Sequence, residues 1–276
     1  MLLKNKIAII TGAGGGIGST IAHTFVQQGC SVILVDRAKS NLERISEELK
    51  KYNSEFLSIT TDACDKKEVD SAVDSVLKRF AKIDILINAA GIQGPIGPLL
   101  NNDVDKWIET INVNLNATML FIKTLLPIMM KQGSGKIINF SGGGAFNSRP
   151  NFSAYATSKA GVVRLTETLA EEVKKYNIQV NAISPGAVNT KMLEQVLESG
   201  AEAAGTEFYK KSIKQKQDGG DPPQLAADLA LFLSSEKSYN LSGKTISAKW
   251  DSWRDWNKED ISKIMLSDLY TLRRII

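Results

Sequence analysis

Short runs of apolar and β-branched residues alternate along this chain with longer segments of helical periodicity. The runs typical of strands cover residues 6–11, 31–36, 55–60, 82–88, 135–141 and 178–184. The segments typical of helices cover residues 17–28, 40–51, 66–80, 103–131 and 152–176. Several strand runs are apolar without alternation, which indicates strands that are buried on both faces. This order predicts an α/β fold in which helices cover both faces of a parallel sheet.

Two regions depart from this alternation. Residues 187–220 are polar, helix-prone and punctuated by glycine, and they follow the strand predicted at 178–184. Ligands bind at the carboxyl edge of open α/β sheets, so we expect this segment to form a helical lid over a substrate site. No linker divides the chain, which predicts one domain at 1–250 followed by a C-terminal extension at 251–276.

Three tryptophans, Trp250, Trp253 and Trp256, are spaced three apart where the extension begins. An aromatic stripe of this kind is more typical of packing than of a cofactor site. We therefore expect the extension to pack on the domain or on a neighbouring subunit.

Composition narrows the possible chemistry. The chain has 276 residues, of which 43% are hydrophobic, and a net charge of +4. Its single histidine, His23, excludes a histidine triad or a histidine-rich metal site. The two cysteines have no metal or redox spacing, and we find no apolar run near the roughly 20 residues of a membrane span. The lysine-rich segment 209–217 matches no nucleic-acid module and is interpreted as a solvated helix. We expect a cytoplasmic protein that binds no metal, nucleic acid or membrane.

The glycine-rich sequence TGAGGGIG at 11–18 lies between the first predicted strand and the first predicted helix. Glycine permits close backbone approach, and the N–H groups at a helix amino terminus bind a pyrophosphate. A P-loop would need Lys before Ser, but Gly18 precedes Ser19. The spacing also differs from Gly-x-Gly-x-x-Gly because residue 17 is Ile17. The strand–turn–helix context nevertheless predicts a dinucleotide site.

Asp36 ends the second predicted strand, where a carboxylate can accept hydrogen bonds from the adenosine ribose hydroxyls. The same carboxylate would repel a 2′-phosphate. NAD is therefore favoured over NADP, although the adjacent Arg37 could turn toward a phosphate.

Tyr155 and Lys159 are four residues apart in the helix predicted at 152–176, so they share one helix face. A free phenol titrates near ~10. Positive charge beside it lowers that pKa. The pair is therefore a candidate general acid–base at neutral pH.

Five motifs, in order along the chain, resemble those of the short-chain dehydrogenase/reductase family. They are TGAGGGIG at 11–18, NAAG at 88–91, NVNL at 112–115, YATSK at 155–159 and SPGAVNT at 184–190. The resemblance extends from about Lys4 to Ile246. It implies a Rossmann-type, doubly wound sheet in a three-layer α/β/α domain that binds NAD(P). It also implies a homodimer or homotetramer formed through the helices at 103–131 and 152–176.

The resemblance also assigns roles to individual residues. Tyr155 would be the general acid–base, Lys159 would bind the nicotinamide ribose and lower the tyrosine pKa, and Asn114 would hold a water in a proton relay. Asp62 would meet the adenine and Thr190 the carboxamide. The implied cofactor-binding residues are Gly12, Gly14, Gly15, Gly16, Ile17, Gly18, Asp36, Arg37, Asp62, Ala63, Asn88, Ala89, Ala90, Gly91, Tyr155, Lys159, Pro185, Gly186, Val188 and Thr190.

One element of the family pattern is displaced. The serine that binds the substrate carbonyl usually lies thirteen residues before the tyrosine, where this chain has Gly142. Ser141 precedes it at a strand end, and the glycines at 142–144 could turn the backbone and bring its hydroxyl into the site. We assign the role to Ser141. The alternative is a site without a serine there, in which a lid residue or a substrate hydroxyl acts; Ser148 and Ser153 are less well placed.

These observations predict an oxidoreductase that moves hydride between nicotinamide and a secondary alcohol or ketone. The sequence LSGKTISAKWDSW, followed by further residues, resembles the ends of reductases encoded with surface-polysaccharide genes. That ending suggests a sugar or a nucleotide-linked sugar as substrate. Two alternatives stay open: an inactive dinucleotide-binding sensor or scaffold, and a nucleotide-sugar epimerase or dehydratase on the same fold.

Overall fold

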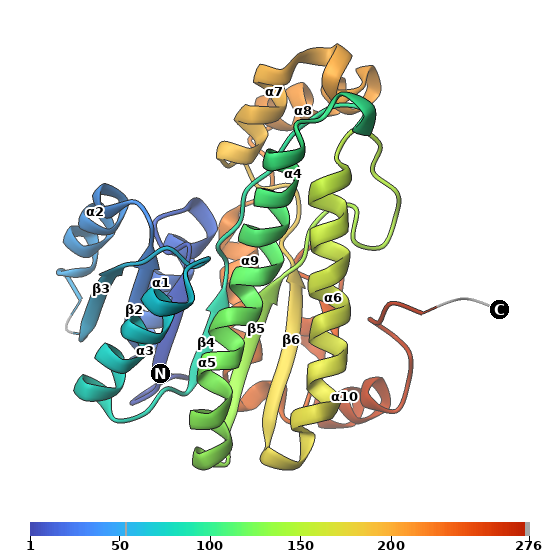
Figure 1. Cartoon of the computed structure of the whole chain (residues 1–276). Coiled ribbons are helices and arrows are strands. Elements are labelled where there is room, and N and C mark those ends of the chain that lie inside the picture. Colours follow the sequence, from blue (N-terminus) through green and yellow to red (C-terminus); the bar gives the residue numbers. More distant parts are fainter. Residues whose placement is uncertain (53, 274–276) are drawn as a thin grey trace.

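The strands form one parallel sheet, as predicted. The computed structural model describes residues 1–52 and 54–273. Within those ranges, seven parallel strands have the order β3-β2-β1-β4-β5-β6-β7 (Figure 1). The strands are β1 (Ile7–Thr11), β2 (Ser31–Asp36), β3 (Phe56–Thr60), β4 (Ile85–Asn88), β5 (Gly135–Phe140), β6 (Ile178–Ser184) and β7 (Thr245–Ser247).

Helices cover both faces of this sheet and produce the three-layer Rossmann-type arrangement. The α-helices are α1 (Gly16–Gln27), α2 (Lys39–Leu49), α3 (Lys66–Phe80), α4 (Val104–Ile111), α5 (Ala117–Gln132), α6 (Ser153–Val173), α7 (Lys191–Ala204), α8 (Thr206–Gln217), α9 (Pro223–Ser234) and α10 (Lys258–Met265). One apolar cluster joins α1, α2, α9 and α10 to one face. A second cluster joins α3, α5 and α6 to the other face.

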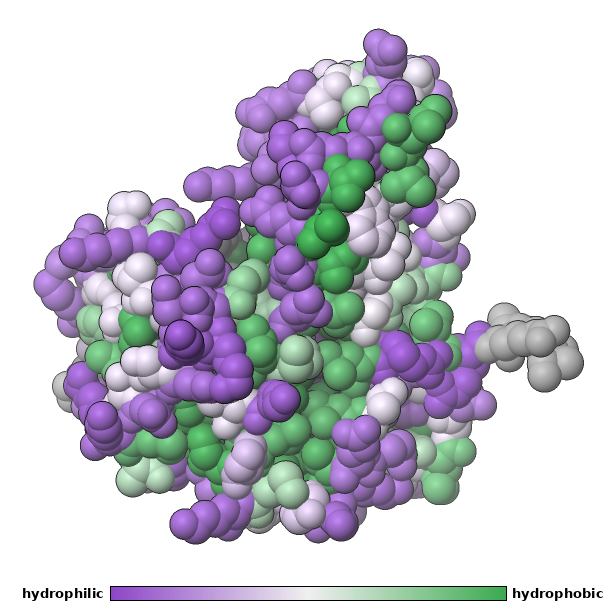
Figure 2. All heavy atoms as spheres, viewed as in Figure 1, coloured by the Kyte–Doolittle hydropathy of each residue, from purple (hydrophilic) through white to green (hydrophobic). Residues whose placement is uncertain are grey.

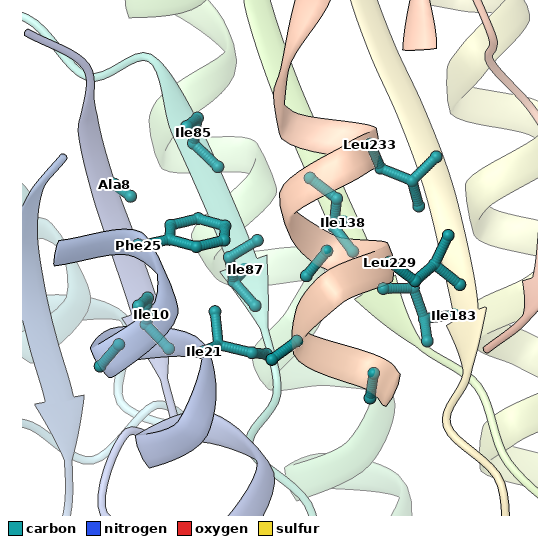
Figure 3. Packing of buried hydrophobic residues seen from close by; sticks show 14 of the residues in the cluster. Ala8, Ile10, Ile21, Phe25, Ile85, Ile87, Ile138, Ile183, Leu229 and Leu233 are labelled. Atoms are coloured by element: carbon teal, nitrogen blue, oxygen red, sulfur yellow. The ribbon is translucent and has the colours of Figure 1, made fainter. Parts of the chain in front are cut away.

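Successive side chains of a strand point to opposite faces of the sheet, so each strand contributes residues to both clusters. In β1, Ala8 and Ile10 belong to one cluster, whereas Ile7 and Ile9 belong to the other. Figure 3 shows buried residues of the first cluster, with side chains of α1 and α9 lying against those of the strands. Because both faces are buried, the strands need apolar residues at successive positions, which explains the continuous runs in the sequence.

The helix predicted at 103–131 contains an irregular turn. The residues Asn112–Asn116 form a π-helical turn between α4 and α5. The resulting segment Val104–Gln132 is long and apolar enough to cross a membrane by length and composition. Lys106, Glu109 and Lys123 interrupt it, so it is not one continuous apolar run. Phe121, Leu125 and Met129 are buried in the cluster against the sheet. One face of the segment therefore packs against the sheet, although only 39% of its most apolar window is buried.

The region expected to form a lid contains two helices, α7 and α8, at the top of Figure 1. They follow β6 and lie beyond the carboxyl edge of the sheet. Gly200, with φ of 78°, kinks α7. Phe208 of α8 and Met192 of α7 pack against a small buried cluster that includes Phe152 and Tyr155.

The described part of the extension packs against its own domain. Trp253 is 4% exposed and lies 5.5 Å from the ring of Phe232 in α9. Trp256 lies between Phe232 and Tyr270. Trp250, in contrast, is 78% exposed. The three tryptophans therefore do not form one helical stripe, because only Trp253–Asp255 forms a short 3-10 helix.

This difference in burial predicts unequal effects on stability. We expect Trp253→Ala to lower the free energy of unfolding by about 3–5 kcal/mol, because it leaves a cavity against Phe232. The matched change Trp250→Ala should alter it by no more than about 0.5 kcal/mol. Urea unfolding followed by circular dichroism measures both. Equal effects of the two changes would show that the extension does not contribute to the core through Trp253.

Candidate active site

The glycine turn between β1 and α1 packs closely against the backbone that follows β4. Gly12 has φ of +64°, and a Cβ there would lie 2.7 Å from Ala90 Cα. A Cβ on Gly18 would lie 2.2 Å from the Gly12 carbonyl oxygen. At Gly16, the first residue of α1, the nearest atom to a Cβ would be Thr190 Cγ2 at 3.8 Å. Gly12 and Gly18 therefore allow the tight backbone contacts of the turn, whereas Gly16 has only an ordinary contact.

Asp36 is held in place at the end of β2. Its carboxylate accepts hydrogen bonds from Gly14 N at 3.0 Å and from Ala38 N at 2.9 Å. Arg37 and Asp62, the other charged residues expected near the adenosine, are exposed. The Asp62 carboxylate accepts a hydrogen bond from Cys64 N at 2.9 Å. The turn and the acidic strand end thus form the two sides of one site, with the free N–H groups of a helix amino terminus between them.

Asn114 joins three parts of the site. Its Oδ1 accepts a hydrogen bond from Ile92 N at 2.8 Å, and its Nδ2 lies 3.0 Å from both Ile92 O and Ser158 Oγ. A Cβ on Gly91 would lie 3.1 Å from Asn114 Oδ1 and 3.6 Å from Lys159 Nζ. The π-helical turn places Asn114 at this junction, and such turns are frequent at functional sites.

Tyr155 and Lys159 face the same site from the first two turns of α6. Lys159 Nζ donates a hydrogen bond to Phe140 O at 2.9 Å and lies 5.7 Å from the centre of the Tyr155 ring. Burial lowers the pKa of Lys159 to about 8. Burial raises the pKa of Tyr155, and the positive charge of Arg149 opposes that rise. The two side chains therefore lie close together, as their spacing predicts. The expected lowering of the Tyr155 pKa by Lys159 is not seen, because burial raises that pKa and the charge that opposes the rise is that of Arg149.

The loop after β5 brings Gly142, and not a serine, against the tyrosine. A Cβ on Gly142 would lie 2.5 Å from Tyr155 Oη. The Ser141 backbone N–H donates to Ile183 O at 2.9 Å and so continues the sheet. The Ser141 Oγ is buried without a hydrogen-bond partner among the described residues. Ser153 Oγ accepts a hydrogen bond from Trp107 Nε1, and Ser148 is exposed.

The segment after β6 completes the same edge of the sheet. Gly186 has φ of +91°, and the adjacent Ala187 N donates to Asp221 Oδ2 at 2.7 Å. Thr190 immediately precedes α7, makes no capping hydrogen bond with its side chain, and lies beside the glycine turn at Gly16. Asp221 also pairs with Lys249 at 2.7 Å, and no sequence motif had indicated either residue.

Arg149 and Ser158 are further residues that sequence analysis did not find. Arg149 lies six residues before Tyr155, and its guanidinium carbon is 5.3 Å from the centre of that ring. Ser158 Oγ donates to Tyr155 O at 2.7 Å. The only sequence feature that could have indicated Ser158 is its position within YATSK. No feature of the sequence indicates Arg149, because its loop follows no periodic pattern.

Comparison with known proteins shows the family of this chain. The sequence profile described as short chain dehydrogenase matches residues 6–200. This chain belongs to the short-chain dehydrogenase family. It is 32% identical to a 3-oxoacyl-(acyl-carrier-protein) reductase of Thermotoga maritima over 89% of this chain and 97% of that protein. It is also 32% identical to a levodione reductase of Leifsonia aquatica, over 85% of this chain and 90% of that protein.

Solved structures show the same family fold. A crystal structure of NAD⁺-bound xylitol dehydrogenase matches with a TM-score of 0.83 and 29% identity, covering 90% of this chain and 98% of that chain. A crystal structure of levodione reductase matches with a TM-score of 0.82 and 27% identity, covering 92% of this chain and all of that chain. The chain is therefore an oxidoreductase of this family, which acts on CH–OH or C=O groups.

The close approaches in the glycine turn generate a prediction on stability. We expect Gly18→Ala to lower the free energy of unfolding by about 1–3 kcal/mol, because a Cβ would collide with the Gly12 backbone. Gly16→Ala has ordinary contacts and should be neutral or slightly stabilising, since alanine favours the helix. Urea unfolding of both variants tests this. A Gly18→Ala variant as stable as Gly16→Ala would contradict the close packing of the turn.

Proposed function

We propose that this enzyme interconverts a ketone and a secondary alcohol with NAD(P), using Tyr155 as the general acid–base. The observation that carries the proposal is the buried Tyr155–Lys159 pair, held at the carboxyl edge of the sheet by the bond from Lys159 Nζ to Phe140 O. A buried ammonium with no carboxylate partner in the described residues is costly. Its retention beside a phenol is consistent with an electrostatic role in proton transfer.

The residues of the glycine turn fit a dinucleotide. The amino terminus of α1 offers N–H groups to a pyrophosphate, and at Gly16 the nearest atom to a Cβ would be 3.8 Å away, so the backbone there is not closely covered by side chains. Asp36 is oriented by two backbone N–H groups and would accept the adenosine ribose hydroxyls, which supports NAD over NADP. When bound, the nicotinamide ring gives or takes the hydride.

In the reducing direction, Tyr155 gives its proton to the oxygen of the forming alcohol. Lys159 stabilises the negative charge that this transfer leaves on the phenol oxygen. Asn114 joins the backbone of Ile92 to Ser158 of α6, and so keeps Lys159 and Tyr155 of the same helix aligned with that segment. In our proposal it also holds a water of the proton relay. Reversal of these steps oxidises an alcohol.

Ser141 remains our candidate for the hydroxyl that binds the substrate oxygen. Its Oγ is buried without a partner in the described chain, so a bound substrate oxygen or a small backbone rotation would satisfy it. The competing hypothesis is a site without a serine, and the contact of Gly142 with Tyr155 Oη favours it. A sugar or nucleotide-linked sugar remains the substrate class that we propose from the sequence ending.

We also propose that the enzyme is a cytoplasmic homodimer or homotetramer. Figure 2 shows apolar side chains gathered over the middle of one face, where α5 and α6 lie in Figure 1. Among the described residues, no group of three or more His, Cys, Asp or Glu side chains could hold a metal ion. The proposed chemistry needs the dinucleotide, Tyr155, Lys159, the water held by Asn114 and a hydroxyl for the substrate oxygen, and it assigns no role to a metal.

A substrate panel tests the function and both serine hypotheses. Oxidation of NADH and of NADPH is followed by absorbance with simple ketones, keto-sugars and nucleotide-linked keto-sugars. Tyr155→Phe should lower kcat by at least about 1,000-fold without loss of cofactor binding, because it removes the proton donor. Ser141→Ala should lower kcat by about 100-fold if its hydroxyl binds the substrate oxygen.

The outcomes separate the alternatives. Full activity of Ser141→Ala would remove Ser141 from the mechanism. Cofactor binding without turnover of any substrate would support the sensor or scaffold alternative. Turnover of a nucleotide-linked sugar without net change in NADH would support an epimerase or dehydratase. Unchanged turnover in Tyr155→Phe would contradict the central proposal.

The pKa of Lys159 predicts a pH dependence. Burial lowers this pKa to about 8, so the ammonium is present below that pH and is lost as the pH rises through it. Burial raises the pKa of Tyr155, so the phenol keeps its proton to higher pH. We expect kcat/KM for ketone reduction to be level below pH 8 and to fall above it, approaching about tenfold per pH unit.

The control is Lys159→Arg, whose guanidinium stays charged at high pH. Its kcat/KM should be lower throughout, but the alkaline decline should move to higher pH. A wild-type profile that stays level to pH 10, or the same decline in both enzymes, would show that protonation of Lys159 is not required.

A further inference from the structure

Arg149 lies beside the proposed acid–base, in the loop between β5 and α6. Its guanidinium carbon is 4.2 Å from the ring centre of Phe152, 4.6 Å from that of Phe208 and 5.3 Å from that of Tyr155. Phe208 belongs to α8, whereas Phe152 and Tyr155 lie at the start of α6. The guanidinium is therefore held among aromatic rings where the lid region meets the active site.

This guanidinium has no anionic partner in the described chain. Among the described residues it makes a single hydrogen bond, a long one from an Nη to Gly143 O at 3.4 Å, and its Nε is buried without a partner. Burial lowers the pKa of Arg149, and the proximity of Tyr155 opposes that change. Other arginines pair with carboxylates within 4 Å, namely Arg44, Arg79, Arg164, Arg254 and Arg273.

Burying the unpaired charge of Arg149 is unfavourable unless its N–H groups find hydrogen-bond acceptors. A guanidinium has five N–H donors, and a desolvated charge without hydrogen bonds is strongly unfavourable. Stacking on the aromatic rings offsets part of this cost through cation–π attraction. It leaves the Nη groups at the end of the guanidinium to contact a carboxylate or a phosphate, whereas Nε is buried.

The glycine loop brings this charge next to the reacting centre. Gly142 lies against Tyr155 Oη, and a Cβ on the next residue, Gly143, would lie 3.2 Å from an Arg149 Nη. Successive residues of one loop thus contact the phenol oxygen and the guanidinium. The neighbouring walls are apolar and include Ile96, Met192 and Tyr209. A substrate oxygen at Tyr155 would have the rest of its molecule close to Arg149.

We propose that Arg149 binds an anionic group of the substrate, a carboxylate or a phosphate, beside the carbonyl that receives the proton from Tyr155. The inference deepens the proposed function and rests on it. The enzyme would then select ketones and alcohols that carry an acidic group. Arg149 would determine specificity, and the missing side chain at Gly142 and Gly143 would provide the room that its guanidinium needs.

Two matched pairs of small ketones test this selectivity. Acetoacetate and methyl acetoacetate differ in a carboxylate, and dihydroxyacetone phosphate and dihydroxyacetone differ in a phosphate. Each is titrated into the complex of the enzyme with NAD⁺ by calorimetry, because a ketone cannot be reduced by the oxidised cofactor. We expect the charged member of at least one pair to bind at least about tenfold more tightly. The pair that shows the preference identifies the carboxylate or the phosphate.

Variants assign the preference to Arg149. Arg149→Met should reduce the ratio of the two affinities to near one, and Arg149→Lys should retain part of it, since an ammonium keeps the charge without the planar edge. The control Lys210→Met removes a cation from α8 that pairs with the exposed Glu207, and it should retain the full ratio. Thermal unfolding shows that each variant is folded.

A purely structural role gives a different result. If Arg149 only holds α8 against α6, its replacement weakens charged and neutral ketones alike and leaves the ratio unchanged. That result, or equal binding of both members of both pairs by the wild-type protein, would overturn the proposal. Failure of the proposed function is seen separately, as absence of NAD⁺ binding in the preceding titration or of NADH oxidation in the substrate panel.

Discussion

The burial of both faces of the parallel sheet is the constraint on which the rest of this structure depends. Parallel strands point the same way, so every strand ends at one edge, and the loops that follow must meet there. The glycine turn follows β1, Asp36 ends β2, the Ala89–Gly91 segment follows β4 and the Gly142 loop follows β5. Residues far apart in the sequence thereby form one site.

Buried polar contacts fix how α6 lies on that sheet. Asn88 donates to Asn139 across β4 and β5 at 2.9 Å, and Asn139 donates to Thr166 of α6 at 2.9 Å. At the site itself, Lys159 bonds to Phe140 O. Apolar packing alone would allow α6 to slide, because it has little directionality. These hydrogen bonds are directional, so they fix the position of α6 along the sheet and with it the position of Tyr155 relative to the carboxyl ends of the strands.

The substrate side of the site departs from the family pattern in a coherent way. Glycine at 142 removes the side chain that would stand against Tyr155, and Gly143 leaves space beside Arg149. The cofactor side keeps the close glycine contacts and the oriented Asp36. Because function depends on the site and not on the fold, one fold can combine the same cofactor chemistry with different substrates.

Much of the fold could be predicted from sequence because its causes are local. Apolar runs and helical periodicity determined the order of strands and helices, and the glycine turn between the first strand and helix indicated the dinucleotide site. The four-residue spacing of Tyr155 and Lys159 placed both on one helix face. Only the tertiary structure decided that Trp253 is buried while Trp250 is exposed, that a π-helical turn carries Asn114, and that Arg149 lies over Tyr155. The physical reason is that periodicity reports the neighbours a residue has along its own element. The partners of an irregular loop are set by packing between segments distant in the chain.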